Sequence, residues 1–163
     1  MGGIEDWGAL LAFVAVNFAA ASTGGIFRPG TWYEELRKPS WTPPNWLFAP
    51  AWTVLYALIA YAGYLVWRSA APGEATVPLI VYGVHLALNA SWSAIFFGLK
   101  RVDLAFLELV VFWLSIVATI ALFYQVRVEA ALILLPYLAW VTFAGALNLA
   151  IWRMNAPIRQ PAV

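Results

Sequence analysis

The sequence predicts an all-α integral membrane protein, folded as a bundle of five transmembrane helices. Its composition is 64% hydrophobic and only 10% charged, whereas about a quarter of the residues in soluble domains are charged. A chain of 163 residues cannot bury that much apolar surface in a water-soluble core. The apolar residues also gather in five stretches, each close to the ~20 residues that a helix needs to cross the hydrocarbon layer.

The five predicted spans follow one another through short connections and form one membrane domain, residues 1–163. They are residues 7–27, 44–67, 77–99, 104–126 and 130–152. The longest connection is residues 28–43, and the others are too short to form a separate domain. No internal repeat is evident, so a transporter built from inverted repeats is not expected.

The first span is not read as a cleavable signal. Glu5 and Asp6 stand where a signal would carry positive charge, and the apolar run is too long. Asn17 lies within this span and is expected to hydrogen-bond a neighbouring helix, because lipid offers it no partner.

Basic residues are unevenly divided between the two ends of the predicted bundle. The end with the first loop has Arg28, Arg37, Lys38, Lys100, Arg101, Arg153 and Arg159. The opposite end has Arg68 and Arg127. Cytoplasmic loops carry the excess of Lys and Arg, so we expect the N-terminus outside and the first loop and C-terminus in the cytoplasm. This rule applies to insertion into an inner membrane, and an organellar or outer-membrane setting would weaken it.

The second span begins inside an unusual segment, "KPSWTPPNWLFAPAW", residues 38–52. It contains four prolines and three tryptophans. An internal proline removes a backbone donor and clashes with the preceding helical turn, while indole rings need something to pack against. We therefore expect a stiff aromatic segment, neither an ordinary helix nor a flexible linker.

The third span has two distinct faces. At 100° per residue, a stripe about 60° wide collects His85, Asn89, Trp92 and Phe96, which we interpret as the lining of a cavity. The opposite face gathers small residues: Gly83, Ala87, Ala90, Ser91, Ala94 and Gly98. Small residues let helices approach closely, so this face is predicted to be a homodimer interface or a contact within the monomer.

Three other polar residues lie within the spans. Glu108, one turn into the fourth span, could be a site residue, but pairing with Lys100 or Arg101 at the membrane surface is the favoured expectation. Asn148 in the fifth span is expected to be structural, like Asn17. His85 is the one histidine and is more often an interior hydrogen-bonding residue, although it could ligate haem iron or exchange protons.

Several classes of function are excluded or disfavoured. A net charge of +1 gives no basic patch for nucleic acid, and the absence of cysteine excludes disulfides, iron–sulfur clusters and thiol catalysis. No metal-ligand cluster, Walker loop or catalytic triad is found, so no metal or required cofactor is expected. The ten Trp, seven Tyr and ten Phe suit stacking on a flat apolar ligand.

Three blocks of the sequence resemble one known family. They are "WYEELRKPSWTPPNWLFAPAWTVLY" (residues 32–56), "LNASWSAIFFGLK" (88–100) and "PYLAWVTFAGALNLAIWRMN" (136–155). They resemble the TspO/MBR family of tryptophan-rich sensory proteins, whose animal member is the translocator protein or peripheral-type benzodiazepine receptor. The resemblance implies a five-helix bundle, commonly dimeric, with a cavity that opens toward the first loop.

The resemblance also implies ligands and site residues. Family members bind porphyrins, including protoporphyrin IX and haem, cholesterol and synthetic benzodiazepine-site ligands. By motif, the pocket residues are Trp32, Tyr33, Trp52, Asn89, Tyr137, Trp140 and Ala144. The prolines of residues 38–52 would then hold the loop as a pre-shaped lid, while Trp41 and Trp46 pack the loop or anchor it at the interface. The sterol segment, Leu147–Arg153, has Ala150 within the interval where the motif needs an aromatic residue, so tight cholesterol binding is not expected.

Three functions are consistent with the family. The first is a sensor or regulator that binds a tetrapyrrole under the loop. The second is an enzyme that degrades protoporphyrin with light and oxygen, with Trp52 or Trp140 forming the reactive radical. The third is a transporter of tetrapyrrole or lipid. The sequence shows no coupling-ion site and no pair of broken helices, which argues against this function.

Overall fold

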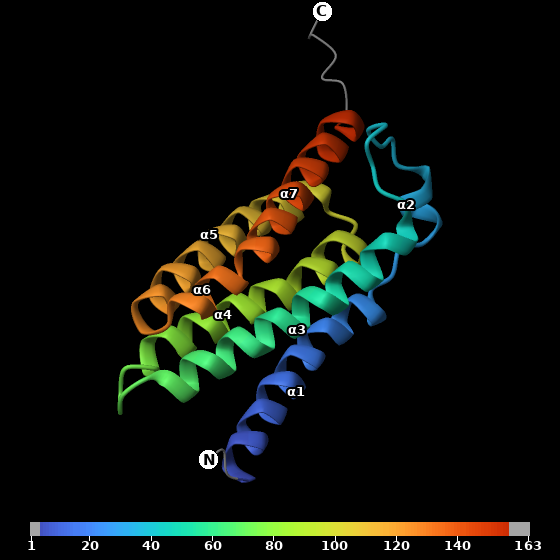
Figure 1. Ribbon diagram of the computed structural model, residues 1–163. Coiled ribbons are helices and arrows are strands. Elements are labelled where there is room, and N and C mark those ends of the chain that lie inside the picture. Colours follow the sequence, from blue (N-terminus) through green and yellow to red (C-terminus); the bar gives the residue numbers. More distant parts are fainter. Residues whose placement is uncertain (1–3, 157–163) are drawn as a thin grey trace, which may run out of the picture.

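The computed structural model describes residues 4–156, and this part of the chain is a bundle of helices without a strand (Figure 1). Its elements are α1 (Ile4–Ile26), α2 (Thr31–Glu35), α3 (Asn45–Ser69), α4 (Thr76–Ser93), the π-helix η1 (Ala94–Gly98), α5 (Val102–Val126), α6 (Val128–Ile133) and α7 (Leu135–Asn155). Five helical segments in this region are long and apolar enough to span a membrane, α6 and α7 together forming the fifth. The five-span helical fold is thus confirmed.

The two ends of the described chain lie at opposite ends of the bundle (Figure 1). α2 and the rest of the first loop lie beside the last turns of α7. This placement follows from an odd number of spans. The side of the membrane that each end faces stays a prediction, and Arg159, counted in it, lies outside the described residues.

The helix of the second span begins at Asn45, so it includes the second half of the proline-rich segment. Pro44 is the N-cap of α3, and Pro50 lies within the helix. Pro50 removes one hydrogen bond, the one its N–H would have given to the carbonyl of Trp46. Trp46 is 71% exposed at the end of the helix, where water and lipid headgroups can reach that carbonyl. The segment is therefore partly an ordinary α-helix, which corrects our expectation.

The third span is regular only as far as Ser93. The five residues Ala94–Gly98 form a π-helical turn, and Lys100 then adopts a left-handed backbone conformation with φ of 56°. Gly98 lets Phe27 pack closely, because a Cβ at Gly98 would lie 2.9 Å from the Phe27 ring. Single π-turns inside α-helices often occur at functional sites, and this one lies beside the cavity described below.

The fifth span is interrupted at Leu134, two residues before Pro136. α6 packs against α3 and α5, whereas α7 packs mainly against α5 and barely contacts α3. The bundle is consequently closed at the α6 end and leaves room between α3 and α7 near the first loop.

The small-residue face of the third span is only partly covered. Gly83 and Ala87 are exposed, while Ala90, Ser91 and Ala94 are half-buried. A Cβ built at Gly83 has no neighbour within 4 Å. The Gly83 and Ala87 part of this face is free for another helix, whereas Ser91 bonds Glu108 of α5 and Gly98 packs on Phe27 within the chain. Its role as a homodimer interface remains a prediction.

Candidate functional site

A cavity of about 810 Å³ lies inside the first-loop half of the bundle. Its walls come from the first loop and from α1, α3, α4, η1, α5 and α7. Ligand pockets usually enclose about 300–1,000 Å³ and are mostly apolar with a few polar groups. The size and the aromatic lining of this cavity fit that description.

Five of the residues chosen from the sequence line the cavity. They are Tyr33, Trp52, Asn89, Trp140 and Ala144. Trp92 and Phe96, expected on the cavity face of the third span, line it as well. Trp32, Tyr137 and His85 are not part of the wall.

One face of α3 supplies an aromatic wall. Phe48, Trp52 and Tyr56 are spaced by four residues and all line the cavity, as expected for neighbours on one helical face. The Trp52 ring lies 5.5 Å from that of Tyr56 and meets the Tyr137 ring edge-on at 6.3 Å. Phe48 and Tyr56 were missed in the sequence, although the same four-residue spacing from Trp52 could have identified them.

Asn89 is held in place by two tyrosines. Its Oδ1 accepts a hydrogen bond from the Tyr56 hydroxyl at 2.6 Å, and its Nδ2 donates to the Tyr137 hydroxyl at 2.8 Å. An amide can make about four hydrogen bonds, so one donor and one acceptor position remain. Tyr137 is fully buried and supports Asn89 and Trp52 from behind. Its role is therefore positional, which corrects its assignment as a wall residue.

α7 supplies the facing wall through Trp140 and Ala144. The Trp140 ring meets the Phe48 ring edge-on at 5.9 Å, so it touches the aromatic face of α3. The small Ala144 side chain leaves space one turn further along. Both radical candidates, Trp52 and Trp140, thus border one cavity.

The first loop docks on the π-helical turn. The rings of Trp32 and Tyr33 meet the Phe96 ring edge-on at 5.9 and 6.0 Å. Phe96 is in turn stacked on Trp92 at 4.8 Å. Trp32 therefore anchors the loop from outside the cavity, while Tyr33 reaches its wall. Burial raises the pKa of the Tyr33 hydroxyl above its ordinary value of 10.0, so the phenol is neutral near pH 7.

A side chain at the end of α7 ties the loop down. Asn155 Oδ1 accepts a hydrogen bond from the Arg37 backbone N–H at 3.0 Å, and Asn155 Nδ2 donates to the Arg37 carbonyl at 2.9 Å. The same amide also donates to the Ile151 carbonyl of its own helix. We call this paired contact the loop latch. It connects the loop to the helix that forms one cavity wall.

Four polar atoms of the cavity wall are buried without a hydrogen-bond partner among the described residues. They are Asn17 Oδ1, Asn148 Oδ1, Trp92 Nε1 and Trp140 Nε1. Both amides use their Nδ2 for structural bonds, Asn17 to Tyr82 and Asn148 to the Val102 carbonyl. Buried polar groups are rarely left unpaired, but each of these atoms has almost no accessible surface, so it is the rest of the side chain that lines the cavity.

His85 lies outside the cavity. Its ring is 1% exposed and is enclosed by Tyr82 and Tyr137, at centroid distances of 5.1 and 5.8 Å. The Tyr137 ring packs edge-on against both His85 and Trp52 of the aromatic wall. The structure therefore does not place His85 where it could ligate an iron in this cavity, which corrects its inclusion among ligand-binding residues.

Glu108 does not pair with Lys100 or Arg101, so that prediction is wrong. Arg101 forms two hydrogen bonds with Asp103, at 2.9 and 2.7 Å, because the two residues flank the start of α5. Glu108 Oε1 instead accepts a hydrogen bond from Ser91 Oγ at 3.1 Å. Within residues 4–156, no group of three His, Cys, Asp or Glu side chains could hold a metal ion.

Most of the chain matches one protein family. The model of the TspO/MBR family matches residues 12–153, which include every wall residue of the cavity. The chain belongs to the TspO/MBR family. It is 48% identical over 144 residues to "Protein CrtK" of Rhodobacter capsulatus, covering 88% of this chain and 89% of the relative.

Two further TspO/MBR relatives span similar lengths. The "Tryptophan-rich sensory protein" of Cereibacter sphaeroides is 40% identical over 150 residues, covering 92% of this chain and 93% of the relative. The human "Translocator protein" is 38% identical over 154 residues, covering 91% of each. The chain is therefore a membrane protein of a family whose members are named for sensing and translocation.

The TspO/MBR sterol segment, Leu147–Arg153, turns part of its surface inward. Leu147, Asn148 and Ile151 are buried and line the cavity. These side chains are not free for a sterol on the lipid side of α7. Weak cholesterol binding stays a prediction.

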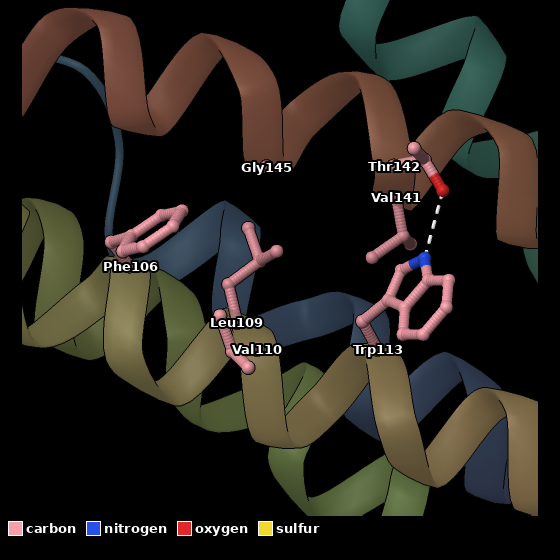
Figure 2. A pocket seen from close by; sticks show the side chains of 7 residues that line it. All are labelled: Phe106, Leu109, Val110, Trp113, Val141, Thr142 and Gly145. Atoms are coloured by element: carbon pink, nitrogen blue, oxygen red, sulfur yellow. Dashed lines mark hydrogen bonds between the residues drawn. The ribbon is translucent and has the colours of Figure 1, made fainter.

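A smaller hollow of about 170 Å³ lies between α5 and α7, on the other side of the Leu109 and Val141 side chains (Figure 2). Trp113 Nε1 closes one end by donating to Thr142 Oγ1 at 2.8 Å. Gly145 lets the helices approach, because a Cβ there would lie 2.9 Å from Leu109 Cδ2. With its single internal hydrogen bond, the hollow is a packing feature of this TspO/MBR chain.

Proposed function

We propose that the protein binds a flat, largely apolar ligand of the tetrapyrrole class in the cavity, and that occupancy is the state it senses. The observation that supports this most is the cavity itself, about 810 Å³ with Trp52, Trp140 and Phe96 on its walls. Aromatic rings on facing walls favour a planar ligand that stacks between them. The names of the relatives, a sensory protein and a translocator protein, agree with a ligand-responsive membrane protein.

The remaining hydrogen-bonding capacity of the cavity wall supports a ligand that carries polar atoms. Asn89 lines the cavity and keeps one donor and one acceptor position beyond its bonds to Tyr56 and Tyr137. A tetrapyrrole ring carries both N–H groups and bare nitrogens. Such a ligand matches these positions better than a purely hydrocarbon ligand does.

Filling the cavity tests the proposal most directly. Ala144→Phe should abolish binding of protoporphyrin IX, because the new ring occupies the space opposite Trp52. Ala146→Phe is the matched control: it adds the same ring two residues further along α7, at an exposed position outside the cavity. Binding is followed by quenching of tryptophan fluorescence in purified protein. Equal affinity in both variants would place the ligand elsewhere.

The same titration under light separates binding from degradation. A sensor returns the porphyrin spectrum unchanged after illumination. Loss of porphyrin that depends on light, oxygen and Trp52 or Trp140 would make the protein an enzyme. Trp46→Phe is the control for a general effect of removing an indole, since Trp46 is exposed and outside the cavity.

A further inference from the structure

One charged side chain borders the cavity. Arg28 follows the end of α1 and lines the cavity at its rim, together with Phe27 and Pro29 of the same segment. No Asp, Glu, Lys or His is found among the described residues that line the cavity. The site thus combines an apolar interior with a single positive charge near its opening.

The guanidinium of Arg28 is tethered by one nitrogen and free at the other two. Nε donates to the Gly25 carbonyl at 2.6 Å. The two terminal nitrogens form no hydrogen bond or ion pair with any side chain that the structure describes. The tether limits the rotamers of the side chain, so a partner that binds the free edge costs less conformational entropy.

Stabilising the end of α1 accounts for only part of this arrangement. A positive charge near a helix C-terminus is favourable by itself, and the bond from Nε already holds the guanidinium there. Arg68, Arg101 and Arg127 each have a carboxylate partner within 4.0 Å. Among the described arginines without such a partner, which are Arg28, Arg37 and Arg153, Arg28 alone lines the cavity. Two parallel N–H donors on a planar fork are the geometry that binds a carboxylate bidentately.

We propose that Arg28 is a specificity-determining residue of the cavity, pairing with a carboxylate on the edge of the bound tetrapyrrole. This inference rests on the proposed function. The ring would lie between Trp52 and Trp140, and its carboxylate edge would face the rim. The positive charge of Arg28 would thus fix the orientation of the ring in the cavity. A neutral ligand of the same shape would stack equally well and lose the ion pair.

The test compares protoporphyrin IX with its dimethyl ester, which has the same ring and no charge. Each is titrated against wild type, Arg28→Gln and Arg153→Gln. Arg153 is the matched control, because it is an exposed cation of the first-loop end that does not line the cavity. We expect wild type to bind the diacid about 10-fold more tightly than the ester, and Arg28→Gln to remove that difference.

Retained ester binding shows that the Arg28→Gln variant is folded. Unchanged diacid binding by Arg28→Gln, or an equal loss of both ligands, would overturn the role of Arg28 and leave the proposed function intact. Failure of wild type to bind either porphyrin would overturn both. The titration is repeated in phosphatidylcholine nanodiscs with and without anionic phospholipid, to identify the source of the anion that binds Arg28. If anionic lipid weakens porphyrin binding and the diacid is not preferred over the ester, Arg28 binds a lipid headgroup instead.

Discussion

The loop latch allows a quantitative prediction. Asn155→Ala removes both hydrogen bonds to the Arg37 backbone. A net hydrogen bond contributes about 0.5–1.5 kcal/mol, and both of these lie at the exposed end of the bundle, so the lower half of that range applies. Losing two of them should favour the open loop by roughly 1–2 kcal/mol, which increases its population about 5- to 30-fold.

Hydrogen exchange measures this opening at the residue concerned. The Arg37 amide is the donor to Asn155 Oδ1, so its exchange rate should rise by that factor in Asn155→Ala. Met154→Ala is the control, since Met154 is 42% exposed on the same helical turn and makes no hydrogen bond through its side chain in the described structure. Equal exchange at Arg37 in wild type and Asn155→Ala would refute the latch.

Two other predictions concern the third span. Gly98→Ala should destabilise the protein by about 1–3 kcal/mol, because its Cβ would lie 2.9 Å from the Phe27 ring; Gly83→Ala, with no neighbour within 4 Å, should be neutral or slightly stabilising in thermal unfolding. If the small-residue face is a homodimer interface, Ala87→Leu should shift the mass measured by light scattering toward a monomer; an unchanged dimer would exclude that face.

The fold was accessible from hydropathy because the membrane imposes both length and polarity on every span. The interruptions were harder to predict. The π-helical turn at Ala94–Gly98 was not predicted. It coincides with packing of Phe96 and Phe97 against Trp92 and Tyr33 of the first loop, a contact between separate elements that periodicity does not reveal. The break at Leu134 did have a signal, Pro136, which the apolar run around it concealed.

The site was predicted where family motifs and helical spacing agreed, as for Trp52, Asn89 and Trp140. His85 lies on the same stripe as Asn89, but one turn deeper, where Tyr137 from α7 fills the space. Periodicity gives the direction of a side chain and not the depth at which a neighbouring helix closes the cavity. From the sequence, Arg28 was counted only as a basic residue of the first-loop end. Its position at the cavity rim depends on the conformation of the loop, which the sequence pattern does not give.

The interruption at Leu134 also makes the two halves of the last span mechanically unequal. α6 is wedged between α3 and α5, while the backbone of α7 packs mainly against α5 and reaches α3 and α4 through the side chains of Trp140 and Tyr137. The last turn of α7 is tied to the first loop by Asn155. A guest in the cavity would therefore lie against the one half of the last span that is bonded to the loop. We expect a change in cavity occupancy to be transmitted to the first loop through this half.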